Sequence, residues 1–242
     1  DGIVMGGGFG VSVHGSHRIA TEKSLFAMPE TGIGLIPDVG GSYFLSRCPG
    51  NIGMYLGLTG ARLKAADMIY TGVATSFVNG EHLNALLDDL VGAGSLDHPA
   101  VDAIIAKYAG DPGPAPIADM RTLIDSTFNK NTVEEIVEAL RANGSDEALK
   151  IHKILGMKSP TSMKLTCRQL QEGGTKSFNE GMVMEFRIVN RIMLGYDFYE
   201  GVRAVIVDKD NQPNWKPDSL GQISDADIDA YFQPLETDIV FA

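Results

Sequence analysis

The stretch that decides the fold is DGIVMGGGFGVSVH, residues 1–14. It starts as an apolar strand, turns through Gly6, Gly7 and Gly8, and continues as a helix-forming segment from Phe9. Such a glycine turn lets the backbone approach a ligand closely and aims backbone N–H groups at an anion or a developing oxyanion. It is also typical of a tight turn that only packs a strand on a helix, and the glycines alone favour neither interpretation.

The glycine spacing does not fit the common nucleotide-binding motifs. In a dinucleotide fingerprint the third glycine would fall on Val11 counted from Gly6, or on Val13 counted from Gly8. No glycine-rich loop ends in Gly-Lys-Ser or Gly-Lys-Thr, so the sequence also lacks a P-loop.

Outward from this stretch, short strands and short helices alternate as far as residue 79. The further strands are expected at residues 17–21, 24–28 and 73–78, and the short helices at 42–47, 51–58 and 64–70. Residues 31–41, rich in glycine and proline, are expected to form a loop. Strands that alternate with helices favour an α/β fold built from βαβ-type units.

Helical periodicity dominates from residue 80 onward. The expected helices are 80–92, 99–108, 116–127, 132–143, 145–157, 160–172, 178–196 and 225–232. Thr132 and Glu135 have the spacing of a capping box, and Ser145 precedes an acidic first turn. Residues 109–116 are the best linker candidate. We therefore expect two parts: residues 1–79 as an α/β core and residues 80–242 as a helical region.

The composition limits the classes of partner. The chain has 242 residues with 20 basic and 31 acidic side chains, a net charge of −11, which disfavours general binding to nucleic-acid phosphates. No apolar run approaches the ~20 residues that a bilayer span needs. Cys48 and Cys167 are far apart in the sequence and have no metal-ligand spacing, so both are interpreted as reduced and structural.

Two carboxylates, Glu30 and Asp38, lie among apolar residues of one loop. Burial and a neighbouring carboxylate both raise a carboxyl pKa, which makes such groups useful for acid–base or nucleophilic chemistry near neutral pH. For Asp38, between Pro37 and Gly40, a turn-capping role remains a real alternative. That alternative is weaker for Glu30.

Other catalytic arrangements have little support. Ser42 follows two glycines but lacks the closing glycine of a nucleophile elbow. His14 and His17 are three residues apart without a Cys, Asp or Glu at a ligand spacing, so no metal site is expected.

Several motifs together resemble the crotonase (enoyl-CoA hydratase/isomerase) superfamily, and within it the 3-hydroxyisobutyryl-CoA hydrolase branch. They are residues 1–10, 26–31, 34–41, 159–162, 200–210 and 215–217. The resemblance implies a crotonase-like core of ββα units, of which this chain carries the C-terminal part, followed by a helical region. It also implies an acyl-CoA thioester substrate, with the CoA belonging to the substrate and no further cofactor.

The resemblance also implies roles for individual residues. The backbone N–H of Gly7 would be one of two donors to the thioester oxygen, Glu30 the catalytic carboxylate, and Asp38 its neighbour that acts on the hydroxyacyl group. Hydratases of the family carry a second glutamate at the position of Gly10 and usually a glycine at the position of Asp38. Both departures favour thioester hydrolysis, with Glu30 either attacking the thioester carbon to form an anhydride or activating water.

The expected reaction is hydrolysis of a short branched 3-hydroxyacyl-CoA, 3-hydroxyisobutyryl-CoA, in valine catabolism. The alternatives are hydration or isomerisation of an enoyl-CoA, and a non-catalytic structural subunit related to the family. The CoA phosphates need a local basic patch, for which the candidates are Lys23, Lys158, Lys164 and Arg168. Lys158 and Lys164, which flank the Ser159-Pro160 turn, are preferred.

The family pattern further implies a segment before Asp1, with a loop that supplies the second oxyanion donor and much of the adenine pocket. On that interpretation the chain alone has little activity. We expect no nucleic-acid or membrane partner, and a homo-oligomer is an option. The expected location is the cytoplasm for a bacterial protein and the mitochondrial matrix for a eukaryotic one.

Overall fold

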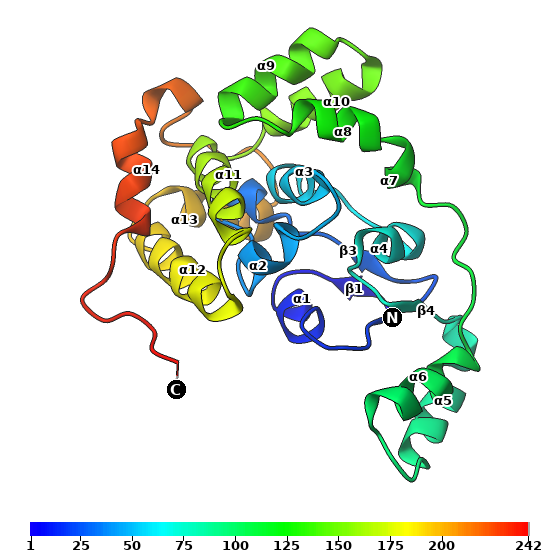
Figure 1. Cartoon of the computed structure of the whole chain (residues 1–242). Helices are drawn as coiled ribbons and strands as arrows, with labels where there is room; N and C mark the ends of the chain where they lie inside the picture. The colour runs from blue at the N-terminus through cyan, green and yellow to red at the C-terminus, as the bar shows by residue number, and fades with distance from the viewer. Residues whose placement is uncertain (242) are drawn as a thin grey trace. The chain divides into compact units, whose positions relative to one another are not determined.

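The computed structural model describes residues 1–241 (Figure 1). The chain divides into two compact units. The first unit comprises Asp1–Phe26 and Arg62–Met120, and the second comprises Ala27–Ala61 and the chain from Arg121 onward. Each unit is thus built from two separate segments of the sequence. The division expected at residue 79 stays a prediction.

The first unit contains the strands and the glycine turn. Its elements are β1 (Ile3–Val4), α1 (Gly7–Ser12), β2 (Ile19–Ala20), β3 (Leu25–Phe26), α4 (Ala65–Thr71), β4 (Ser76–Phe77), the 3-10 turn η2 (Gly80–His82), α5 (Leu83–Val91), α6 (His98–Ala106) and α7 (Pro116–Asp119). β1 pairs in parallel with β3, and β2 pairs in parallel with β4. Parallel pairs need a crossover between them, which is the connection that alternating strands and helices predict.

The second unit is helical. Its elements are the 3-10 turn η1 (Glu30–Ile33), α2 (Gly41–Leu45), α3 (Ile52–Thr59), α8 (Arg121–Thr127), α9 (Val133–Asn143), α10 (Asp146–Leu155), α11 (Pro160–Gly173), α12 (Phe178–Ile192), α13 (Asp197–Val202), the π-helical turn η3 (Arg203–Val207), the 3-10 turn η4 (Leu220–Gln222) and α14 (Asp225–Phe232). Its core includes Ile36, Leu165, Met184 and Ile188. In Figure 1 α9 and α10 lie side by side, and α11 lies beside α3.

Glycines bring the helices of the second unit into backbone contact with α2. A Cβ on Gly53 of α3 would lie 1.7 Å from the Leu45 carbonyl oxygen, and one on Gly173 of α11 would lie 2.3 Å from the Ser42 carbonyl oxygen. No side chain fits at either place, because real Cβ contacts are not that short. α2 is therefore held tightly, together with the loop that precedes it.

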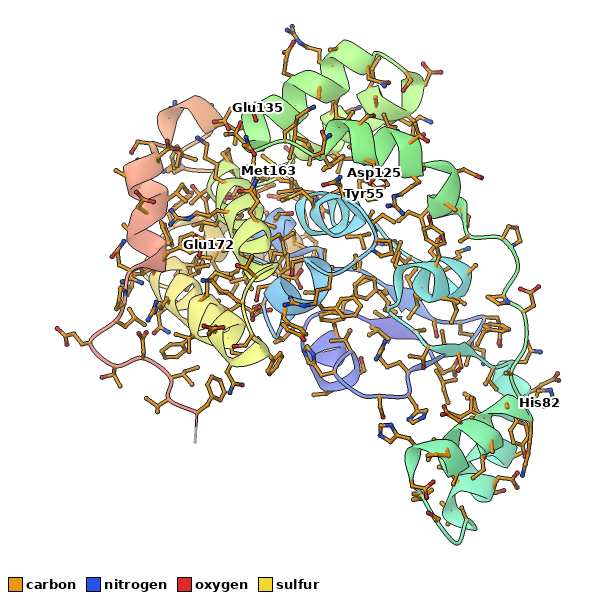
Figure 2. All side chains as sticks on the ribbon, viewed as in Figure 1. Tyr55, His82, Asp125, Glu135, Met163 and Glu172 are labelled. Atoms are coloured by element: carbon orange, nitrogen blue, oxygen red, sulfur yellow. The ribbon has the colours of Figure 1, made fainter. Side chains whose placement is uncertain are left out.

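The predicted helix starts are confirmed. Thr132 and Glu135 form a capping box at the start of α9, where Figure 2 labels Glu135, and the Ser145 side chain accepts from the Ala148 N–H to cap α10. These caps satisfy amide N–H groups that have no partner inside the helix.

Four sequence expectations were wrong in detail. Residues 31–41 are not wholly a loop, since η1 includes residues 31–33, and the helix expected at 116–127 is two helices, α7 and α8, separated at Met120 where the chain passes between units. The helix expected at 178–196 ends at Ile192. α13, η3 and η4 were not expected. One-turn elements carry too few residues for a periodic pattern, so tertiary contacts determine them.

Within residues 1–241 no helix combines the length and the apolar character that crossing a bilayer requires. Among the same residues, no three His, Cys, Asp or Glu side chains gather closely enough to bind a metal ion.

Candidate active site

Glu30, in the second unit, is a buried carboxyl group with an unpaired oxygen and a raised pKa. It is the first residue of η1, its side chain is only 5% exposed, and its Oε2 atom has no hydrogen-bond partner among the described residues. The pKa of Glu30 is raised to about 8, mainly by burial; a hydrogen bond with its own backbone lowers it, the charge of Asp38 raises it, and the charge of Lys158 lowers it. An unpaired oxygen on a buried carboxyl group destabilises the folded state, and a strongly shifted pKa is characteristic of a functional site.

Tertiary contacts hold η1 from two sides. The Thr31 hydroxyl donates to the Leu58 carbonyl of α3 at 3.1 Å, and the Ser159 N–H donates to the Thr31 carbonyl at 3.0 Å. Ser159 is also the N-cap of α11. The Ser159-Pro160 motif therefore fixes the element that carries Glu30.

α13 presses on η1 through two glycines. A Cβ on Gly201 would lie 2.4 Å from the carbonyl carbon of Ile33, and one on Gly34, whose φ is +74°, would lie 2.4 Å from that of Asp197. The backbones can approach this closely because a glycine without a Cβ stands on one side of each contact. The motif at residues 200–210 thus packs against the turn that carries Glu30.

Asp197 links the motif at residues 215–217 to Ser159, which contacts η1. Its carboxylate accepts from the Ser159 hydroxyl at 2.6 Å and from the Lys216 N–H at 2.8 Å. Arg203 forms ion pairs with Glu200 and Asp208, which shape η3. These residues, which the sequence shows only as motifs, have structural roles close to η1.

Asp38 lies on the loop between η1 and α2 and is partly buried, which raises its pKa. The loop is strained directly after it, because Val39 has a φ of 53°. A β-branched residue in this left-handed region costs about 1–3 kcal/mol, so surrounding contacts must impose the conformation. The charge of Asp38 contributes to the raised pKa of Glu30, and a joint role of the two carboxylates in catalysis stays a prediction.

The basic candidates differ in their surroundings. Lys23 pairs with Asp1, Lys164 with Glu134, and Arg168 with both Glu172 and Asp229. Lys158 has no ion pair within 4.0 Å among the described residues, and burial lowers its pKa while Glu30 opposes the decrease. Its ammonium lies 3.3 Å from the position that a Cβ on Gly32 would take. Binding of CoA phosphates by any of these side chains stays a prediction.

Gly7 begins α1 in the first unit, whereas Glu30 and Asp38 belong to the second. No side chain caps this helix, and a Cβ on Gly7 would meet nothing within 4 Å. As the first helical residue, Gly7 has an N–H that the helix itself leaves without a partner. Its role as an oxyanion donor stays a prediction.

Comparison with known proteins identifies the family. The model of the enoyl-CoA hydratase/isomerase family matches residues 1–232. The chain belongs to this family. Among solved structures, a carnitinyl-CoA dehydratase from Mycobacterium thermoresistibile superposes with a TM-score of 0.91 at 35% identity, covering 98% of this chain and 67% of that one. An enoyl-CoA hydratase from Rhodobacter sphaeroides gives 0.87 at 34%, covering 97% and 67%. The expected crotonase-like α/β fold is confirmed.

Curated relatives of this family member are named mitochondrial 3-hydroxyisobutyryl-CoA hydrolases. The rat protein is 48% identical over 240 residues, the human protein 46% over 239, and the Xenopus laevis protein 49% over 240. Each alignment covers 97% of this chain and 62% of the relative. The chain thus spans about three fifths of the length of these relatives.

The expectation for the cysteines is confirmed. Cys48 and Cys167 are free and buried, and burial raises the pKa of both thiols to about 12. A thiol that stays protonated is a poor nucleophile, so both side chains serve the packing of this family member.

Sequence reasoning missed Glu185 and Gln169, which contact the Asp38 loop from α12 and α11. One signal was available for Glu185, because it lies on the apolar stripe formed by Gly181, Met184 and Ile188. A charged residue at a core position of an amphipathic helix needs polar partners, and here these come from the loop.

Glu30→Gln is expected to stabilise the fold increasingly as the pH rises. Folding raises the pKa of Glu30 from 4.5 to about 8, so the folded state takes up a proton between these values. Wild-type stability therefore falls from pH 4.5 to 8 relative to a glutamine that does not titrate, by up to about 5 kcal/mol. Thermal denaturation at pH 5 and pH 9 measures the effect.

The matched control is Glu236→Gln, because Glu236 is exposed. Its melting temperature is expected to follow that of the wild type at both pH values. If Glu30→Gln also follows the wild type at pH 9, the Glu30 carboxyl group is not desolvated.

Proposed function

We propose that the protein hydrolyses 3-hydroxyisobutyryl-CoA, a short branched 3-hydroxyacyl-CoA thioester, to the free acid and CoA, a step of valine catabolism. The observation that carries this proposal is Glu30, a buried carboxyl group with one unpartnered oxygen and a pKa of about 8. The names of the curated relatives supply the substrate.

In the proposed reaction the Glu30 carboxylate acts on the thioester carbon. As a nucleophile it forms a mixed anhydride and releases CoA thiolate, and water then cleaves the anhydride to the acid and the free carboxylate. As a general base it removes a proton from the water that attacks the thioester directly. In both routes the Gly7 N–H donates to the oxyanion, and Asp38 orients the 3-hydroxyl group and the water.

A hydration or dehydration reaction is the second candidate, because two similar solved structures carry the names carnitinyl-CoA dehydratase and enoyl-CoA hydratase. Gly10 disfavours it. The residue lies on α1 and offers no carboxylate, so it cannot share a water molecule with Glu30 as a second glutamate would.

The deciding experiment measures two reactions of the full-length protein side by side. Thiol release from 3-hydroxyisobutyryl-CoA is followed with a thiol reagent, and hydration of crotonyl-CoA is followed by loss of its absorbance. We expect thiol release without hydration. Hydration without thiol release would overturn the proposal and select the second candidate.

A location and an assembly are part of the same proposal. We propose the mitochondrial matrix for a eukaryotic source, since the curated relatives are named mitochondrial, and the cytoplasm for a bacterial one. A segment of the protein preceding this chain would supply the second oxyanion donor and much of the adenine pocket. A homo-oligomer remains part of the proposal.

The rate of thiol release is expected to increase with pH through about pH 8. Both routes need ionised Glu30, whose pKa is about 8, so only a minor fraction is active at pH 7. Asp38 and Lys158, the charged groups that act on Glu30, respectively raise and lower this value. A profile of kcat/KM from pH 6 to 9 checks the expectation, and a profile flat over this range would contradict it.

A further inference from the structure

Glu185 is a buried carboxylate that the proposed reaction does not use. It lies on α12, is 2% exposed, and has no ion pair within the described residues. Its Oε2 atom accepts from the Gly40 N–H at 2.9 Å, and its Oε1 atom accepts from the Ser42 N–H at 2.9 Å and from the Ser42 hydroxyl. All three donors belong to the segment just after Asp38.

The other side of Asp38 is held from α11. The Gln169 Nε2 atom donates to the Pro37 carbonyl at 2.7 Å, and the Gln169 side chain is fully buried. Between these attachments Val39 has a φ of 53°. Hydrogen bonds on both sides therefore maintain a backbone conformation that the chain rarely adopts by itself.

We propose that Glu185 is the positioning residue for Asp38: by accepting three hydrogen bonds from Gly40 and Ser42, its carboxylate fixes the loop from which Asp38 acts on the substrate. The inference rests on the proposed function, because it assigns Asp38 to the reaction. Glu185 touches no reacting group in this account and acts only through the loop.

The pattern of donors requires a carboxylate at this place. Two oxygens face three donors, and each oxygen accepts from at least one backbone N–H. A glutamine has a single oxygen, so its amide NH₂ would face either the Gly40 N–H or the Ser42 N–H. Glu185→Gln keeps the size of the side chain and removes one backbone hydrogen bond, which isolates the positioning role from packing.

The test is made on the full-length protein with Glu185→Gln. Misplacing a reacting group by about 1 Å can lower a rate about 100-fold, so we expect kcat to fall by about 10- to 100-fold with little change in KM. Hydrogen–deuterium exchange is expected to become faster at residues 39–42 alone. The control is Asn190→Ala, an exposed position of the same helix whose side chain bonds only within α12, and both measurements should match the wild type.

Each outcome decides one question. Wild-type kcat together with wild-type exchange in Glu185→Gln would overturn the inference, and so would a lower kcat without faster exchange of the loop. A wild-type protein that releases no thiol would overturn the proposed function instead. The exchange measurement would still test whether Glu185 fixes the loop after Asp38. If Glu185→Gln does not fold, Ser42→Ala replaces it, because this variant removes only the hydroxyl donor. We expect a smaller decrease in kcat and faster exchange at Gly40 and Ser42. A Ser42→Ala protein with wild-type kcat and wild-type exchange would overturn the inference.

Discussion

Glu30→Gln is expected to decrease thiol release from 3-hydroxyisobutyryl-CoA by about 10³-fold or more, because an amide is neither a nucleophile nor a base at neutral pH. The substitution preserves the shape of the side chain. The side chain is buried in η1, and the fold should be retained because glutamine carries no charge to desolvate. The measurement is kcat at pH 8, with Glu236→Gln as an exposed control expected to match the wild type.

The same variant tests the assignment, and wild-type protein distinguishes the two routes. Equal rates for wild type and Glu30→Gln would remove Glu30 from the mechanism. In wild-type protein, oxygen-18 from labelled water appearing in the Glu30 carboxyl group, or a hydroxamate at Glu30 after turnover with hydroxylamine, requires an acyl-enzyme anhydride. A Glu30 left unmodified by both reagents over many turnovers would favour the general-base route.

Gly201→Ala is expected to destabilise the protein by about 3 kcal/mol and to decrease activity together with stability. The added Cβ would lie 2.4 Å from the carbonyl carbon and oxygen of Ile33, which are backbone atoms that cannot rotate away. α13 and η1 must then separate, which exposes Glu30 to water. For a chain of this size the melting temperature should decrease by about 6–12 °C.

The sign of this effect is informative, because helix propensity alone favours alanine over glycine by about 1 kcal/mol. Gly221→Ala is the matched control: a Cβ there meets nothing within 4 Å, so its stability should remain within about 0.5 kcal/mol of the wild type. If Gly201→Ala is as stable as Gly221→Ala, α13 does not press on the Glu30 turn.

The local patterns of the sequence predict a large part of the fold. The helices α9 to α12 and α14 were expected close to their observed positions, because each has an apolar stripe or a capping residue within its own sequence. The glycine turn before α1 was expected for the same reason. Its three glycines follow an apolar strand, but only Gly6 precedes the helix: α1 begins at Gly7, two residues before the expected start at Phe9.

The candidate site was predictable only in part. Glu30 and Asp38 stand out because both carboxylates lie among apolar residues, and the resemblance to the family adds their roles. The residues that fix these two carboxylates were not predictable from local pattern. Glu185 is 145 positions from Gly40, and Gly201 is 168 positions from Ile33, so both contacts depend on how distant helices pack.

The sequence by itself determined the residue types that the chemistry needs, because these are properties of short segments. They are a glutamate among apolar residues, an aspartate on the same loop and a glycine turn. Only the tertiary structure decided how reactive Glu30 is. Its pKa of about 8 arises mainly from burial, while the charge of Asp38 raises the pKa and the charge of Lys158 lowers it. Desolvation and charge interactions depend on distances in space, and the order of residues along the chain does not fix those distances until the helices have packed.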